Sequence, residues 1–379
     1  MPEQLPNNFL AVLKQAEGFV AQEILPRSER MRHGEPLAAL GAEVRAASKR
    51  VGFFYKTQPE AFGGAPAGAL ELTMLREYWA SANSELTRFV FGPGPGILHE
   101  ATGELASQFL KPVMAGEKRG AFGFTEPDNA LRPTWAVLAK DELTLNGQKS
   151  YVTGGDTADF LSILVNVEDP TGAKLGTAMV VVDREADGVI LDDTFTSMEG
   201  GGHAAFRFEA VKVPSWHMIG KLGEGMPRAL ANIGNVRLMV AAEAMGMSLW
   251  ALGFLNQHLL APHRTGGTLG DKEGVRLRYA ELRIQAFAGR SVLYRAARRA
   301  DAPGNSVNEV IAAKVFCTEV ASTIIDWAVQ LVGGQALVVG HPLEALYRRV
   351  RSLRLVEGAN DLLRLNLAKG NLELGKGNL

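Results

Sequence analysis

The stretch LTLNGQKSYVTGGDTADFLSILVNV, residues 143–167, decides the fold, together with TAMVVVD at 177–183, GVILDD at 188–193 and FRFEAVKVP at 206–214. These short runs are rich in β-branched and aromatic residues, and clusters of glycine and aspartate separate them. Such spacing is typical of a small antiparallel β-barrel or sandwich. We therefore expect a middle β domain over residues 119–225.

Both flanks of this segment repeat apolar residues at the three- and four-residue spacing of helices. Residues 1–118 contain one such pattern near the start, a second after Pro36, a third from about Ala69 and a last one that we expect to stop near Pro112. In the first pattern the residues on one face are Phe9, Val12, Leu13, Ala16, Phe19 and Val20.

Residues 226–379 contain four further periodic stretches, at about 236–256, 274–300, 306–332 and 342–350. Four helices in succession favour an antiparallel bundle. The predicted fold class is therefore α+β multidomain, with an N-terminal α-helical domain at 1–118, the middle β-barrel or sandwich domain at 119–225 and a C-terminal four-helix bundle at 226–379.

Composition excludes several classes of protein. The net charge of −1 gives no reason to expect a nucleic acid or an anionic membrane as partner. The N-terminus lacks the pattern of a signal peptide, and we find no apolar window of about eighteen residues, so no membrane span is expected. The seven histidines show no metal-ligand spacing. Cys317 is the only cysteine and lies in an apolar run, which predicts a buried thiol and fits a cytoplasmic location.

Five strings occur in the order in which the acyl-CoA dehydrogenase family carries similar ones. They are PEAFGG at 59–64, LKPVMAGEKRGAFGFTEP at 110–127, LNGQKSYVTGGDTADF at 145–160, VKVPSWHMIGKLGEG at 211–225 and AVQLVGGQALVVGHPLEALYRRVRSLRLVEGAND at 328–361. Each string alone is weak, but their common order from residue 59 to residue 361 resembles that family closely. The resemblance implies the three-part fold above and FAD as cofactor.

The same resemblance implies the reaction, which is α,β-dehydrogenation of an acyl thioester such as an acyl-CoA to the trans-2-enoyl thioester. Glu357 would be the base that removes the α-proton, flavin N5 would accept the β-hydride, and Arg237 and Gly358 would bind the substrate. A family variant takes its base from the residue beside this arginine, but Val236 cannot serve. The alternative interpretation of Glu357 is a solvated carboxylate at a helix end.

Flavin-binding residues are also implied by the resemblance. Thr125 and Thr153 match positions that hold the flavin ring, Tyr151 stands where the family usually has a tryptophan against the ring, and Phe122 and Phe124 line the same cleft. An aromatic side chain at position 151 can still stack. The alternative is that all five are ordinary strand residues, since threonine and aromatics are common in strands.

A second group of residues resembles contacts to the FAD of a neighbouring subunit. Gln330, Gly333 and Gly334 match the family's Q-x-x-G-G segment, although a glycine pair that ends a helix explains them equally. Arg264 is a candidate for the arginine that reaches the FAD pyrophosphate. The match implies a homo-oligomer, either a dimer or a dimer of dimers, with an electron-transfer flavoprotein or similar acceptor as electron partner.

Departures from the family pattern leave other functions open. After FTEP the chain lacks the serine that contacts flavin and substrate, and Gly234 replaces an aspartate three residues before Arg237. The thioester carrier is therefore either CoA or a carrier protein. A flavin oxidase or monooxygenase on the same scaffold, and a non-catalytic subunit of a mixed oligomer, are the alternative functions.

Overall fold

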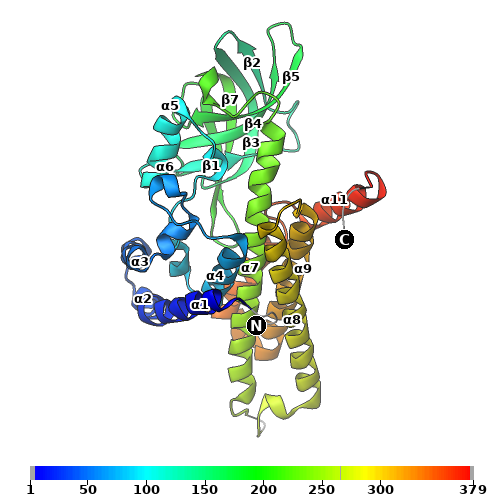
Figure 1. Cartoon of the computed structure of the whole chain (residues 1–379). Coiled ribbons are helices and arrows are strands. Elements are labelled where there is room, and N and C mark those ends of the chain that lie inside the picture. The colour runs from blue at the N-terminus through cyan, green and yellow to red at the C-terminus, as the bar shows by residue number, and fades with distance from the viewer. Residues whose placement is uncertain (1–4, 265, 376–379) are drawn as a thin grey trace. The chain divides into compact units, whose positions relative to one another are not determined.

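The computed structural model describes residues 5–264 and 266–375 (Figure 1). The chain forms two compact units, in which the first and third sequence segments largely pack together. Unit 1 comprises Met1–Thr57, Ala65–Gly92 and Gly234–Leu379, and unit 2 comprises Gln58–Gly64 and Pro93–Ile233. The predicted three-part division therefore follows secondary structure along the chain, whereas packing divides the chain in two.

Three helices at the start of unit 1 form where the apolar periodicity predicts them, namely α1 (Asn7–Phe19), α3 (Leu37–Val51) and α4 (Ala69–Ser81). The sequence did not predict α2 (Leu25–Arg32), which has no fully buried residue to mark an apolar face. The apolar faces of the three predicted helices meet in one core, where the rings of Phe19, Phe53 and Trp79 contact one another edge to face at 5.1–5.9 Å between centroids. Such aromatic contacts add to the free energy gained by burying the rings.

Two short π-helical segments precede prolines. The first, Val20–Ile24, comes before Pro26, and the second, Ala106–Leu110, comes before Pro112. Proline has no N–H to donate to the carbonyl four residues earlier, so a widened turn accommodates it without ending the helix. Our expectation that the helix stops near Pro112 was therefore wrong: it continues as α6 (Lys111–Ala115) and ends at Gly116, whose φ is +78°.

The C-terminal helices of the chain confirm the predicted helical part. They are α7 (Gly225–Leu260), α8 (Glu273–Asp301), α9 (Val307–Val332), α10 (Pro342–Ser352) and α11 (Asn360–Leu372). The sequence did not reveal α11. Cys317 on α9 is fully buried, as expected, and burial raises the pKa of its thiol.

Two of these helices correct the expectation about membrane spans. By length and composition alone, α7 and α9 could each cross a membrane. However, 67% of the apolar window in α7 and 50% of that in α9 are buried inside the protein. Core helices of a helical bundle are equally long and apolar and are buried in the same way. The hydropathy of these two helices is therefore no argument for a membrane location.

Unit 2 contains a mixed eight-stranded sheet, ordered β6-β7-β3-β2-β4-β5-β8, with β1 paired to β4. The strands are β1 (Gly120–Gly123), β2 (Trp135–Ala139), β3 (Glu142–Thr153), β4 (Phe160–Glu168), β5 (Lys174–Asp183), β6 (Val189–Thr196), β7 (Gly202–Pro214) and β8 (Met218–Ile219). The expected purely antiparallel arrangement was wrong, because β1 and β2 both pair with β4 in parallel. Both strands are short, and neither has a strand pattern of its own in the sequence.

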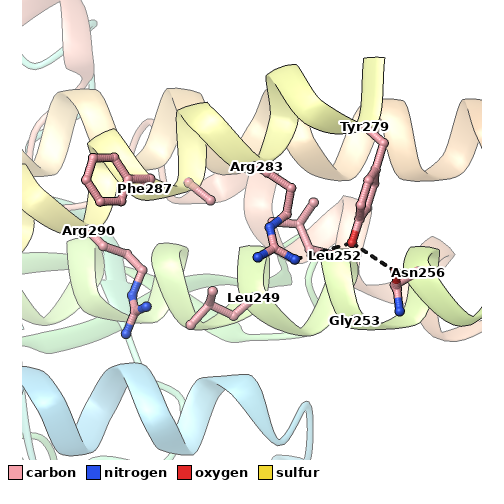
Figure 2. Close-up of a pocket in the computed structure, with 9 residues that line it drawn as sticks. Leu249, Leu252, Gly253, Asn256, Tyr279, Arg283, Phe287 and Arg290 are labelled. Carbon is pink, nitrogen blue, oxygen red and sulfur yellow. Dashed lines mark hydrogen bonds between the residues drawn. The ribbon is translucent and has the colours of Figure 1, made fainter. Parts of the chain in front are cut away.

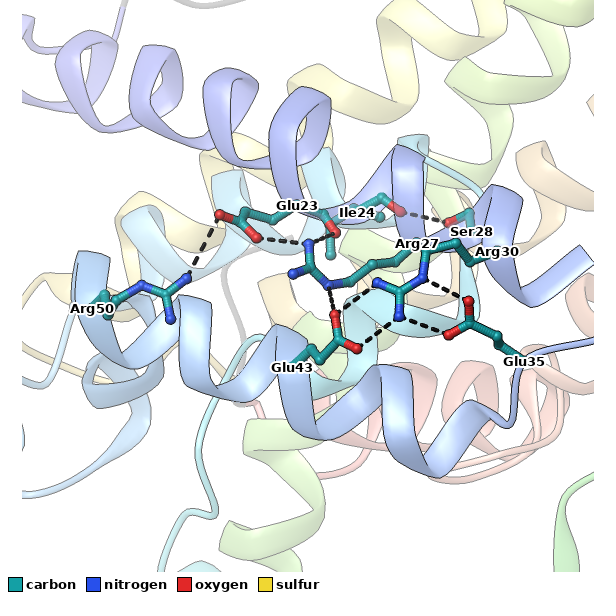
Figure 3. A network of polar contacts seen from close by, with 8 residues as sticks. All are labelled: Glu23, Ile24, Arg27, Ser28, Arg30, Glu35, Glu43 and Arg50. Atoms are coloured by element: carbon teal, nitrogen blue, oxygen red, sulfur yellow. Dashed lines mark hydrogen bonds and ion pairs between the residues drawn. The ribbon is translucent and has the colours of Figure 1, made fainter.

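Two contrasting ion-pair clusters lie in unit 1. On the surface, Arg27 and Arg30 of α2 share the carboxylate of Glu43 on α3 at 2.8–2.9 Å (Figure 3). In the interior, Glu77 on α4 accepts two hydrogen bonds from Arg290 on α8, at 2.7 and 2.8 Å. The buried cluster therefore joins two helices that are far apart in the sequence.

Candidate functional site

Glu357 lies in the turn between α10 and α11, not within a helix. Its φ is +55° and that of Gly358 is +98°, so two successive residues adopt left-handed backbone. This conformation costs a residue with a Cβ about 1 kcal/mol or more. The backbone N–H of Asn360 donates to the carbonyl of Arg354 at 2.9 Å and closes the turn.

Two buried cations hold this turn from neighbouring helices. Arg237 on α7 donates from Nε to the Glu357 carbonyl at 3.0 Å. Lys314 on α9 donates from Nζ to the Gly358 carbonyl and to Asn360 Oδ1, both at 2.9 Å. Only 8% of Arg237 and none of Lys314 is exposed. The structure thus brings together Arg237, Glu357 and Gly358, three of the residues that the sequence suggested.

The Glu357 carboxylate is half-buried, and within the described residues no group donates a hydrogen bond to it. Burial raises its pKa, while the charges of Arg237 and Lys314 act in the opposite direction. Burial and the charge of Arg237 lower the pKa of Lys314 to about 8. A carboxyl group with a raised pKa is suited to exchange a proton with a ligand.

In unit 2, the predicted flavin residues surround a bulge in β3. The pairing of β3 with β7 shifts register between Lys149 and Val152, and Tyr151 has a φ of +54° at this point. As a result, 66% of the tyrosine is exposed. Beside it, the N–H of Ser150 donates to the carbonyl of Thr125 at 2.9 Å, which joins two of the predicted segments.

Side chains around the bulge extend this surface. Thr153 Oγ1 hydrogen-bonds to His203 Nδ1 at 3.2 Å. The ring of Phe195 meets that of Tyr151 edge to face at 5.4 Å and stacks on His203 at 5.5 Å. Ser150 Oγ is buried and has no hydrogen-bond partner among the residues that the structure describes. An aromatic ledge with an unsatisfied hydroxyl beside it suits a planar polar ligand.

Phe122 and Phe124 have a clear structural role. Their rings stack at 6.2 Å and pack against a core cluster of unit 2. The segment that follows is anchored by Glu126, which accepts a 2.6 Å hydrogen bond from the buried Lys149. These contacts fix the course of FTEP whether or not the two phenylalanines touch a ligand.

The residues matched to a neighbouring subunit lie at the surface of unit 1. Gln330 is exposed near the end of α9, and Arg264 is exposed in the α7–α8 connection. Gly333 has φ +84° and ψ −162°, a conformation essentially restricted to glycine, so the turn itself requires this residue. Gly334 begins the next short helix. Their roles toward FAD stay predictions.

A cavity of 430 Å³ lies between α7 and α8, lined among others by Asn256, Tyr279, Arg283 and Phe287 (Figure 2). None of the predicted site residues lines it. Tyr279 donates to Asn256 Oδ1 at 3.4 Å, and Arg283 Nη1 donates to the Tyr279 hydroxyl at 3.5 Å. These long hydrogen bonds within the wall leave its polar groups directed at one another, so the cavity gives no indication of the chemistry.

Sequence reasoning missed several residues that shape the two sites. Lys314 stands in the otherwise apolar run AAKVFC, and a lone charge in such a run was a usable signal. Asn360, His203 and Phe195 gave no such signal. Their importance follows only from which partners the fold brings beside them.

Comparison with known proteins connects these features to a family. Residues 8–117 match the description "Acyl-CoA dehydrogenase, N-terminal domain", and residues 223–372 match "Acyl-CoA dehydrogenase, C-terminal domain". The chain is 26% identical over 372 residues to 3-(aryl)acrylate reductase of Clostridium sporogenes, across 96% of this chain and 98% of that protein.

Two further proteins are similar over nearly their whole length. The caffeyl-CoA reductase-Etf complex subunit CarC of Acetobacterium woodii is 25% identical over 361 residues, across 93% of this chain and 94% of that protein. The structure of butyryl-CoA dehydrogenase from Megasphaera elsdenii has a TM-score of 0.79 at 23% identity, and covers 98% of this chain and 100% of that chain. This last likeness shows the fold.

Proposed function

Because the chain belongs to the acyl-CoA dehydrogenase family, we propose that it oxidises an acyl thioester to the α,β-unsaturated thioester, with Glu357 as the group that takes the α-proton. The observation that carries this proposal is the Glu357 turn. It holds a half-buried carboxylate without a hydrogen-bond donor among the described residues, with its pKa raised by burial. A purely structural carboxylate at such a position would be expected to have a partner.

FAD is the cofactor that membership of the family assigns to the chain. The residues of unit 2 fit a flavin, because Tyr151 presents an exposed ring on the β3 bulge and Ser150 Oγ lacks a hydrogen-bond partner among the described residues. We propose that Tyr151, Thr125 and Thr153 hold the ring system. When bound, FAD supplies the two-electron oxidant that accepts the β-hydride.

The residues of the turn account for the other half of the reaction. The α-C–H bond of a thioester releases its proton only if the negative charge that develops on the carbonyl oxygen is stabilised. Within the described residues, neither the Glu357 nor the Gly358 backbone N–H has a recorded acceptor. We propose that these two N–H groups donate hydrogen bonds to the thioester carbonyl while the Glu357 carboxylate takes the proton. Arg237 and Lys314 would fix the turn that positions them.

Reduction of an enoyl thioester is a second candidate function. It is favoured by one observation, namely that two similar proteins are named as reductases of arylacrylate and caffeyl-CoA. In that direction Glu357 would return a proton to the α-carbon, because the same group must act in both directions. The raised pKa of Glu357 is compatible with either role.

We further propose an electron-transfer flavoprotein as electron partner and a homo-oligomeric assembly. The first is supported by the name of the similar protein from Acetobacterium woodii, a subunit of an Etf complex. The second rests on the match of Gln330 to Gly334 with a segment that completes the FAD site of a neighbouring subunit. Light scattering that finds a monomer at micromolar concentration, with FAD still tightly bound, would contradict the assembly.

The decisive experiment is anaerobic stopped-flow reduction of the flavin by a panel of acyl-CoA and carrier-protein thioesters, with Glu357→Gln as the variant. The amide keeps the shape of the side chain but is no useful base. The rate should fall by more than the ~10²–10⁴ typical of general-base assistance, because proton removal and hydride loss are coupled. FAD content should be unchanged.

A Glu357→Gln rate within about tenfold of wild type would show that another group takes the proton. Protein that stays colourless after reconstitution with FAD would favour a non-catalytic subunit instead. Rapid turnover with oxygen as the only acceptor would favour an oxidase. Flavin that is reduced beforehand and reoxidised by enoyl thioesters, but that no acyl thioester reduces, would favour the reductase.

A further inference from the structure

We propose that Lys314 is a positioning residue for Glu357: it holds the turn in its left-handed conformation and sets the pH range over which the Glu357 carboxyl is ionised. This inference rests on the proposed function, since it assumes that the ionisation of Glu357 matters to the reaction. It goes further by assigning a role to a buried lysine that lies on another helix.

The first support is geometry. A fully buried ammonium group is rare and is expected to have full hydrogen bonding. Both recorded acceptors of Lys314, the Gly358 carbonyl and Asn360 Oδ1, belong to the Glu357 turn, each at 2.9 Å. Lys314 therefore fixes the first and third residues after Glu357, and among the described residues it donates to no other segment.

The hydrogen bonds of Lys314 to Gly358 and Asn360 form a clamp on the Glu357 turn, and further contacts of Asn360 extend this clamp and orient it. Asn360 Nδ2 donates to Thr318 Oγ1 at 3.0 Å and to Glu319 Oε1 at 3.2 Å. Because the amide nitrogen is engaged on α9, the amide oxygen must face Lys314. The outer end is closed by Arg364 of α11, which donates to Glu319 Oε2 at 2.6 Å.

The second support is charge. The charged groups that act on Lys314 are Arg237 on α7, Glu319 on α9 and Glu357 in the turn. Glu319 is also engaged by Arg364 and lies 3.9 Å from Arg354. Among the described residues, Glu357 is therefore the carboxylate of this group whose charge is offset by Arg237 and Lys314 alone. Removing the lysine charge should raise the pKa of Glu357 further.

The expected effect on stability has a definite sign. Burial raises the pKa of Glu357 in the folded protein above its unfolded value of about 4.3. Relative to Glu357→Gln, the wild type therefore loses stability as pH rises from about 4.3 through the folded pKa, and the difference is constant above it. Without the lysine charge this window should extend to higher pH.

The test measures the thermal unfolding midpoint of the FAD-loaded protein across this pH range, in four forms. These are the wild type, Glu357→Gln, Lys314→Met and the double variant. In the Lys314→Met background, the pH at which the Glu357→Gln difference levels off should move up by on the order of one pH unit. Coincident curves in the two backgrounds would overturn the proposed electrostatic role.

Asn360→Ala is the matched control, because it loosens the clamp and keeps the lysine charge. Hydrogen–deuterium exchange of the segment around residues 355–361 should rise in both Asn360→Ala and Lys314→Met, whereas the pH window should move only in Lys314→Met. Unchanged exchange in Asn360→Ala would overturn the positioning role, and this holds even if Lys314→Met does not fold. Thr318→Val, one step further out, should have a smaller effect than either.

Failure of the proposed function would look different. If substrate reduces the flavin of Glu357→Gln at the normal rate, Glu357 is not the base. The shift in the pH at which the stability difference levels off, which is measured without substrate, can still be present in that case. The converse outcome is distinct. If Glu357→Gln abolishes flavin reduction by substrate while the pH at which the stability difference levels off stays the same in the Lys314→Met background, Glu357 stands as the base. Lys314 would then not control its ionisation.

Discussion

Two glutamates of unit 1 show how the same side chain is used in opposite ways. Glu77 is 2% exposed and accepts hydrogen bonds from Arg290 Nε and Nη2 and from the Tyr294 hydroxyl, at 2.7, 2.8 and 2.7 Å. Glu357 is half-buried, lies on left-handed backbone and has no donor to its carboxylate among the described residues. The Glu77 carboxylate is therefore fully hydrogen-bonded, whereas the Glu357 carboxylate is free to accept a proton.

The difference lies in which atoms the neighbouring cations reach. Arg290 meets the carboxylate of Glu77, whereas Arg237 and Lys314 bind backbone carbonyls of the Glu357 turn and act on the carboxylate only through their charge. A saturated carboxylate stabilises a fold but cannot accept a proton from a ligand without losing its partners. An unsaturated one costs stability and keeps its reactivity, so the two should respond oppositely to mutation.

The largest effect on stability is expected at Glu77. Glu77→Ala leaves Arg290 and the Tyr294 hydroxyl buried without this acceptor, which should lower the free energy of unfolding by about 3–5 kcal/mol. Glu77→Gln keeps one acceptor oxygen and should lose less. Chemical denaturation of the FAD-loaded protein measures both. A loss below about 1 kcal/mol in Glu77→Ala would mean that Arg290 finds another acceptor, and the comparison with Glu357 would fail.

A smaller effect of opposite sign is expected at Glu357. Glu357→Gly and Glu357→Gln both remove the buried charge, but only the glycine variant also relieves the left-handed strain. Glu357→Gly should therefore be more stable than Glu357→Gln by about 0.5–1 kcal/mol. Lys140, with a φ of +55° in the β2–β3 turn, offers a matched control for strain alone. If Lys140→Gly stabilises the protein and Glu357→Gly does not, the turn is held by its clamp so firmly that strain is not relieved there.

The sequence predicted the parts of this picture that depend on local pattern. Apolar periodicity located α1, α4 and α7 to α10, and the collinear strings singled out Glu357 and Arg237. The sequence could not predict that Arg237 reaches the Glu357 carbonyl across 120 positions, or that Lys314 reaches Gly358 across 44. Such contacts depend on helix packing, which no local string encodes.

The same limit explains the errors in unit 2. The strand β1 forms by parallel pairing with β4, and β2 lies between β3 and β4, so both depend on partners distant in the sequence and their own short sequences carry little signal. The exposed ring of Tyr151 depends on a bulge between Lys149 and Val152, which is a property of the register with β7. The sequence could therefore match individual site residues to those of a family, but the contacts around these residues are known only from the structure.

The smallest effect is expected at a third glutamate, on the surface. Arg30, followed by Arg27, lowers the pKa of Glu43 (Figure 3). Its contribution is therefore present above the unfolded pKa of about 4.3 and is lost as pH falls through the folded value, opposite to Glu357. At neutral pH, Glu43→Gln should lower the unfolding midpoint slightly, whereas Glu357→Gln should raise it.

The surface position makes the Glu43 effect sensitive to salt, which the Glu357 effect should not be. At about 1 M salt the Debye length is about 3 Å, so the pairs of Glu43 with Arg27 and Arg30 are largely screened. Thermal unfolding midpoints at low and high salt should therefore converge for wild type and Glu43→Gln. The difference between wild type and Glu357→Gln should persist, because it arises from removing a carboxylate from water and screening by ions does not reach that cost. If both differences vanish together in salt, the Glu357 carboxylate is solvated like Glu43, and its reactivity must come from the substrate complex.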